Sequence, residues 1–129
     1  MFQNLDIFKM SHAMAVHAGR QQATAAQNVA NADTPGFKAR RLPTFAQSFL
    51  RHSDEGTAQR ASRDRHLHGS ASGGGVMARI DRTAPVDPNG NSVSLENEML
   101  HALEAKRQHD RALAIYKTSL GILRTSLGR

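Results

Sequence analysis

Two long segments of helical periodicity, one at each end of the chain, limit the possible folds more than any other feature. In residues 5–32, small and apolar side chains recur at alternating steps of three and four, and no proline interrupts them. The same alternation runs from Met99 to Leu127. Such steps place side chains on one face of an α-helix, as in coiled coils. At 1.5 Å per residue, the two helices would be roughly 40 and 50 Å long.

The segment between these helices has a different composition. Residues 51–91 are rich in Ser, Gly, Arg, Asp and His, and their only candidate element is a short strand at residues 76–80 with no evident partner. A stretch of this length is typical of a flexible loop. Before it, Phe45 and Phe49 are one helical turn apart and indicate a short helix.

We therefore predict an all-α fold. Its two long terminal helices form an antiparallel coiled-coil-like hairpin, with a short helix and a long, flexible central loop. The predicted regions are residues 1–50 (N-terminal long helix, turn motif and short helix), 51–91 (flexible central loop) and 92–129 (C-terminal long helix).

Local sequence signals mark the end of the first long helix and the beginning of the second. Pro35 disfavours helical geometry at the residue before it, and Gly36 can supply the positive φ of a type II turn over residues 34–37. Ser94 is in position to cap the C-terminal helix, and Glu96 lies in the first turn of that helix, where an acidic side chain suits the helix dipole.

The two helices carry more apolar surface than one hairpin can cover. A second stripe, which includes Ile115 and Ile122, widens the apolar face of the C-terminal helix in its last third. Each helix of a pair covers one stripe, so the additional surface requires neighbours. The alternative is a monomeric three-helix bundle, in which the short helix around Phe45 and Phe49 covers that stripe. Such a bundle would melt cooperatively, whereas an assembly subunit would fray at its ends when dilute.

Composition narrows the possible functions. The net charge of +6 permits a nucleic acid, a membrane or an acidic protein as partner, but the sequence has no recognised nucleic-acid-binding motif. Asp64, His66 and His68 are metal-compatible, yet they stand in a Ser- and Gly-rich segment without a second cluster, and we interpret them as solvated. We expect no nucleic-acid partner, no metal, no cofactor and no small-molecule ligand. No catalytic arrangement is visible in the sequence, so we do not expect an enzyme.

Targeting signals are weak. Residues 1–20 lack the pattern of a cleaved secretory signal, and no segment approaches the length of a membrane span. If the chain leaves the cytoplasm, we expect a route that needs no cleaved peptide.

Residues 25–40 carry a family likeness. They read Ala-Ala-Gln-Asn-Val-Ala-Asn-Ala-Asp-Thr-Pro-Gly-Phe-Lys-Ala-Arg. This segment resembles the signature of the flagellar rod and hook protein family, in which a helix end with two asparagines leads into Thr-Pro-Gly, an aromatic residue and a basic residue. Residues 31–36, and residues 89–99 followed by a helix that contains residues 114–123, are similar to the proximal-rod type of subunit. The short chain also favours this type, since the longer relatives carry added β-domains.

The resemblance implies a structural subunit of the proximal rod of the bacterial flagellar basal body. Its terminal helices would assemble into the axial tube that transmits motor torque to the hook. It would be exported to the periplasmic space by the flagellar type III apparatus, without a cleaved signal peptide. Its partners would be itself, other flagellar rod proteins, the membrane-ring junction and components of the export gate.

The resemblance also assigns residues. The family turn motif falls on Asn28, Asn31, Asp33, Thr34, Pro35, Gly36 and Phe37. The expected assembly interface comprises Leu5, Phe8, Ala15, Ala26, Val29, Leu113, Ile115, Tyr116, Leu120, Ile122, Leu123 and Leu127. The alternative function is a basic helical binding module for nucleic acid or a partner helix, which salt-sensitive retention on DNA would favour.

Overall fold

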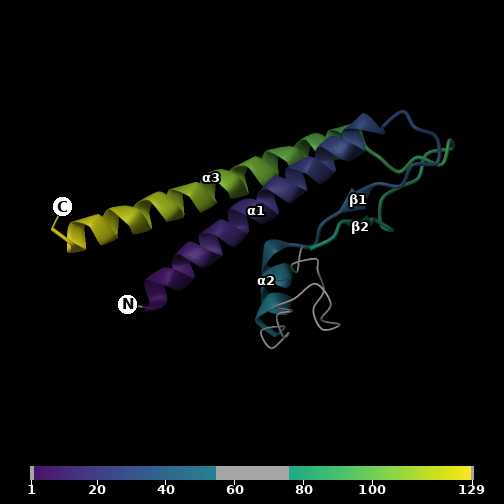
Figure 1. Cartoon of the computed structure of the whole chain (residues 1–129). Helices are drawn as coiled ribbons and strands as arrows, with labels where there is room; N and C mark the ends of the chain where they lie inside the picture. Colours follow the sequence, from purple (N-terminus) through teal and green to yellow (C-terminus); the bar gives the residue numbers. More distant parts are fainter. Residues whose placement is uncertain (1, 55–75, 129) are drawn as a thin grey trace, which may run out of the picture.

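The computed structural model describes residues 2–54 and 76–128. The chain forms helix α1 (Phe2–Ala30), strand β1 (Arg40–Arg41), helix α2 (Phe45–Asp54), strand β2 (Arg79–Ile80) and helix α3 (Leu95–Ser126). Helices α1 and α3 lie side by side and antiparallel, and both chain termini are at the same end of this hairpin (Figure 1). The prediction of an all-α fold with two long terminal helices is confirmed.

Small side chains form the contact face of the hairpin. On α1, Ser11, Ala18 and Ala25 are buried at steps of seven residues. On α3, Ala105 and Ala112 are buried with the same spacing. A repeat of seven keeps a residue on the side that faces the partner helix, and side chains of this size allow two helices to approach closely.

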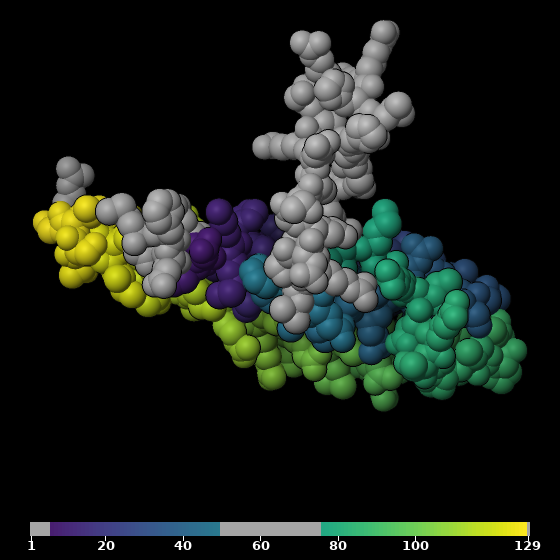
Figure 2. Space-filling model, turned by 90° about the horizontal axis from the view of Figure 1, so that it is seen from below, coloured from purple at the N-terminus to yellow at the C-terminus, as the bar shows by residue number. Residues whose placement is uncertain are grey.

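An aromatic contact shows the register of the two helices. The rings of Phe8 and Tyr116 meet edge to face, with their centroids 5.1 Å apart. Because the helices are antiparallel, this contact brings Ser11 level with Ala112, and Ala18 level with Ala105. The last residues of α3, yellow in Figure 2, extend past the coloured part of α1, which is purple.

Helix α2 begins with a reciprocal cap. The Gln47 amide donates to Thr44 Oγ1, and the Thr44 amide donates to Gln47 Oε1, each at 3.4 Å. This is the capping-box pattern of Thr followed three residues later by Gln. Phe45 then contacts both Phe49 and the imidazole of His17 on α1, at centroid distances of 5.5 and 5.7 Å. The short helix predicted from the two phenylalanines is therefore present and begins against α1.

The two short strands form a feature that the sequence analysis missed. Strand β2 pairs antiparallel with β1, so that Arg40 is opposite Ile80. The Asp81 amide donates to the Ala39 carbonyl at 2.8 Å, and Arg41 Nε lies 3.1 Å from Asp81 Oδ2. The inference that a strand at residues 76–80 has no partner was wrong, because its partner lies about forty residues earlier in the chain.

No helix in the described residues is both long enough and apolar enough to cross a membrane.

Candidate assembly interface

The turn motif after α1 has the predicted conformation at its glycine. Gly36 has a φ of 73°, and the Phe37 amide donates to the Thr34 carbonyl at 3.3 Å. A hydrogen bond between residues three apart, with positive φ at the third position, is the type II turn expected from Pro35-Gly36. The turn reverses the chain, so that residues 37–42 run back along α1.

Asn28 holds this returning segment against α1. Its side chain is 0% exposed, its Nδ2 donates to the Arg40 carbonyl at 2.8 Å, and its Oδ1 accepts from the Arg40 amide at 3.0 Å. A carboxamide has both a donor and an acceptor, so it satisfies both backbone groups of one residue. Asn28 therefore acts as a side-chain substitute for a strand partner.

Asn91 closes the end of α1 from the other side of the hairpin. It is 1% exposed, and its Nδ2 lies 3.0, 2.6 and 2.9 Å from the carbonyl oxygens of Asn31, Ala32 and Thr34. Its Oδ1 accepts from the Val93 amide at 2.8 Å. These three residues form the turn that follows α1, and the Asn31 and Thr34 carbonyls also accept from the backbone amides of Thr34 and Phe37. Asn91 therefore joins this turn to the segment before α3 and supplies the donor for the Ala32 carbonyl.

The sequence analysis did not identify Asn91 as a site residue. Turns are rich in exposed asparagines, and nothing local distinguishes a buried one.

Two glycines allow the turn and the segment before α3 to touch. A Cβ on Gly90, whose φ is 81°, would lie 3.3 Å from Gly36 Cα. The Gly36 amide donates to the Asn89 carbonyl at 3.0 Å, and Lys38 Nζ donates to the Gly90 carbonyl at 2.8 Å. The turn motif and residues 89–92 are thus one connected structure. Of these residues, 89–91 belong to the segment predicted as a flexible loop.

His17 on α1 contacts the beginning of α2. It is buried, and its Nε2 lies 3.0 Å from the Pro43 carbonyl oxygen and 3.5 Å from Ser48 Oγ. Burial lowers the pKa of His17 below its ordinary value of 6.5; the hydrogen bond to Pro43 opposes this effect and the nearby Arg20 charge adds to it. The neutral imidazole, donating from Nε2 to Pro43, is therefore the favoured form.

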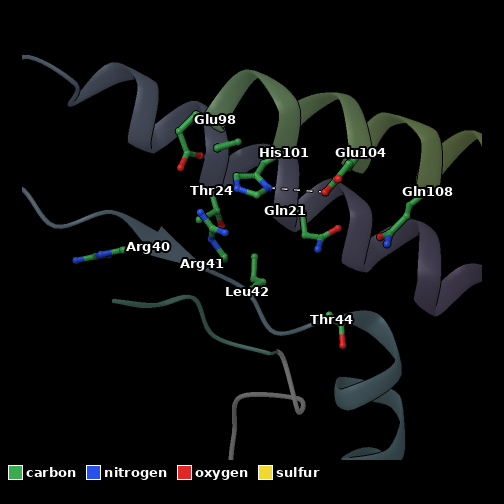
Figure 3. Close-up of a pocket in the computed structure, with 11 residues that line it drawn as sticks. Gln21, Thr24, Arg40, Arg41, Leu42, Thr44, Glu98, His101, Glu104 and Gln108 are labelled. Atoms are coloured by element: carbon green, nitrogen blue, oxygen red, sulfur yellow. Dashed lines mark ion pairs between the residues drawn. The ribbon is translucent and has the colours of Figure 1, made fainter. Parts of the chain in front are cut away.

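A polar pocket lies where α1, α3 and β1 meet (Figure 3). Its volume is about 220 Å³, and its lining includes Arg40, Arg41, Glu98, His101 and Glu104. His101 Nδ1 lies 3.7 Å from Glu104 Oε2 across its rim. Charges of both signs line the pocket, so it has no net charge that would select an ionic ligand. The described residues hold no group of three His, Cys, Asp or Glu side chains placed for a metal, and Asp64, His66 and His68 lie outside those residues.

The expected interface residues on α1 are divided between two faces. Phe8 contacts Tyr116, and Ala15 is half-buried, so both lie near α3. Ala26 and Val29 are exposed, since the neighbouring positions Ala25 and Asn28 are the ones that face inward. Leu5 lies in α1, but its side chain is outside the described part of the structure.

The expected interface residues on α3 are mostly accessible. Leu113 and Tyr116 are exposed, Ile122 is 63% exposed and Leu127 is 77% exposed. Ile115, Leu120 and Leu123 are half-buried. Residues 113–127 thus present several apolar side chains to solvent, and the hairpin covers them only in part.

Comparisons with known proteins agree with the motif. The family model described as "Flagella basal body rod protein" matches residues 17–38, which span the second half of α1 and the turn that follows it. The chain is 26% identical over 119 residues to the "Flagellar basal body rod protein FlgB" of Agrobacterium fabrum (strain C58 / ATCC 33970), an alignment that covers 90% of this chain and 88% of the relative. With the two long terminal helices and the intact turn, these matches show that the chain is similar to flagellar basal body rod proteins.

Proposed function

We propose that this chain is a structural rod protein that forms the proximal part of the flagellar rod and assembles there through its terminal helices, chiefly through the exposed apolar side chains near the end of α3. The similarity to flagellar basal body rod proteins supports the structural role, the location in the basal body and assembly with other rod components. The proximal position is supported by the similarity to a relative named FlgB along most of both chains.

The observation that carries this proposal is the exposed apolar surface at the end of α3. Ile122 and Leu127 leave most of their surface in water, and Leu113 and Tyr116 are also exposed. Burying apolar surface contributes about 25 cal/mol per Å², so this surface favours contact with neighbouring subunits. Shared between many copies, such contacts would give a tube stiff enough to carry torque from the motor to the hook.

The route to this location is part of the proposal. The chain would cross to the periplasmic space through the flagellar type III apparatus without a cleaved signal, and would meet the membrane-ring junction and the export gate at the rod base. Long helices with small buried side chains suit such a route, because little compact core must be dismantled before export.

The assembly surface is tested by Ile122→Asp in a strain whose own copy is deleted. A charge buried at a subunit contact without a partner costs several kcal/mol, so we expect loss of swimming and of rods in isolated basal bodies. Ile122 is a cleaner site than Leu120 or Leu123, which are half-buried within the hairpin.

Ala114→Asp is the matched control. Ala114 is exposed, and it is two residues, or roughly 200° of helical rotation, from the buried Ala112. Ala114→Asp adds the same charge on the outer side of α3 and should swim normally. Normal swimming by Ile122→Asp at wild-type protein level would refute the proposed surface, and normal swimming by the deletion strain would refute the rod role.

A further inference from the structure

A groove between α1 and α2 has an apolar floor and a basic rim. Its volume is about 340 Å³, and Val16, Phe45 and Phe49 supply apolar lining. Lys9 and Arg20 stand at its two ends along α1 and are both exposed. Lys9 Nζ lies 3.9 Å from Asp6 Oδ1, a contact between two well-exposed side chains, which holds little energy. The groove therefore suits an apolar segment that carries acidic side chains.

The first three turns of α3 have that character. Leu95, Met99, Leu100 and Leu103 are all exposed, and Met99 is 65% exposed. Residues 95–104 contain three glutamates and no Lys or Arg, in a chain with 17 Lys and Arg against 11 Asp and Glu. Glu96 and Glu104 are exposed beside the apolar side chains, whereas Glu98 is buried. This acidic, apolar stretch is the complement of the groove.

The two surfaces lie on opposite sides of the hairpin. On α1, Val16 is two residues from Ala18, which faces α3; on α3, Leu103 is two residues from Ala105, which faces α1. Two residues correspond to roughly 200° of rotation about a helix. The groove and the acidic face therefore point away from each other, and one molecule cannot join its own two surfaces.

We propose that the acidic face, Leu95 to Glu104, of a second copy of this chain occupies the groove between α1 and α2. Contact between two different surfaces is head to tail, and repetition of such a contact builds an open helical array unless it closes into a ring. The inference rests on the proposed assembly role and adds which surfaces two copies use. It is independent of the apolar end of α3, which remains free for other contacts.

Disulfide trapping tests this contact directly, because the chain contains no cysteine. Purified full-length Val16→Cys and Met99→Cys variants are oxidised separately, as an equal mixture, and as one chain carrying both changes. We expect no cross-link in either single variant alone, a dimer in the mixture, and a ladder of higher multimers for the double variant. Val86→Cys, at an exposed position outside both surfaces, replaces Met99→Cys as the control and should give no dimer.

Charge reversal provides a second, independent measurement. Lys9→Glu with Arg20→Glu should reduce the mixed dimer by about tenfold, since like charges would then face each other. Glu96→Lys with Glu104→Lys on the other partner should restore it. Helical circular dichroism confirms that each variant is folded.

Three results would overturn the inference while leaving the rod role intact. The first is absence of the mixed dimer at the highest soluble concentration with both variants folded. The second is a dimer of Met99→Cys with itself, which indicates a two-fold contact. The third is cross-linking of Val16→Cys in cells to a different protein and not to this chain.

Discussion

At the closed end of the hairpin, where α1 ends and α3 begins, two buried asparagine side chains form hydrogen bonds with backbone groups. Asn28 pairs with both backbone groups of Arg40, and Asn91 satisfies carbonyls at the end of α1. Their burial is compatible with their polarity because the groups around them are complementary. The turn motif is thus defined as much by these side chains as by Pro35 and Gly36.

The Asn91 network predicts a measurable stability loss. Asn91→Ala removes the donor to the Ala32 carbonyl and the acceptor for the Val93 amide, whereas the Asn31 and Thr34 carbonyls keep their bonds to backbone amides. It should therefore lower the free energy of unfolding by roughly 1 to 3 kcal/mol. Asn91→Asp should be at least as damaging, because a carboxylate oxygen would face those carbonyls. Urea unfolding followed by circular dichroism measures both. Asn97→Ala, at an exposed position in the first turn of α3, is the control and should change little; equal stability of all variants would contradict the network.

At the scale of elements, the sequence predicts where the long helices begin and end. It does not predict which of their faces pack against each other. The predicted segment 5–32 and the observed α1, Phe2–Ala30, differ by two or three residues at each end. Yet two adjacent seams on α1 carry small side chains, and periodicity treats them alike. The structure buries the seam of Ala18 and Ala25 and leaves Ala26 and Val29 exposed, a choice set by how closely α3 approaches.

The pairing of β1 with β2 and the capping by Asn91 were beyond sequence reasoning for a related reason. Both join residues about forty to sixty positions apart, and both depend on the turn that first brings the chain back. The family motif located that turn, but a motif gives no distances to residues outside it.

The contact of His17 on α1 with the beginning of α2 predicts that the free energy of unfolding depends on pH. The pKa of His17 is lowered in the folded chain, so between 6.5 and that lowered pKa the unfolded chain binds more protons than the folded one. The contribution of His17 to the free energy of unfolding is therefore fully present above pH 6.5, and it is lost as the pH falls from 6.5 to the lowered pKa. His17→Gln, which removes the titrating group, should flatten this part of the profile in urea unfolding at pH 5 to 8. His12→Gln, at an exposed position, should keep the wild-type slope; an unchanged slope in His17→Gln would contradict the assignment.

At the scale of the whole molecule, burial is uneven along the hairpin. Among the described residues of α3, the buried positions are Glu98, Ala105 and Ala112, all in its first eighteen residues. The closed end also holds Asn28, Asn91 and the strand pair, whereas the end with both termini holds the exposed Ile122 and Leu127. The closed end of the hairpin is therefore well packed. The end with both termini exposes apolar side chains that neighbouring subunits must cover.

Hydrogen exchange in the dilute, isolated chain should reveal this gradient. Amides of residues 98–112 should exchange slowly as one unit, and those of residues 113–126 at least about tenfold faster, because local opening costs less where fewer apolar contacts are broken. In assembled rods the difference should disappear, since neighbouring subunits then cover Ile122 and Leu127. Uniform protection along α3 in the isolated chain would mean that the hairpin covers its own apolar surface. Neighbouring subunits would then not be needed to cover it.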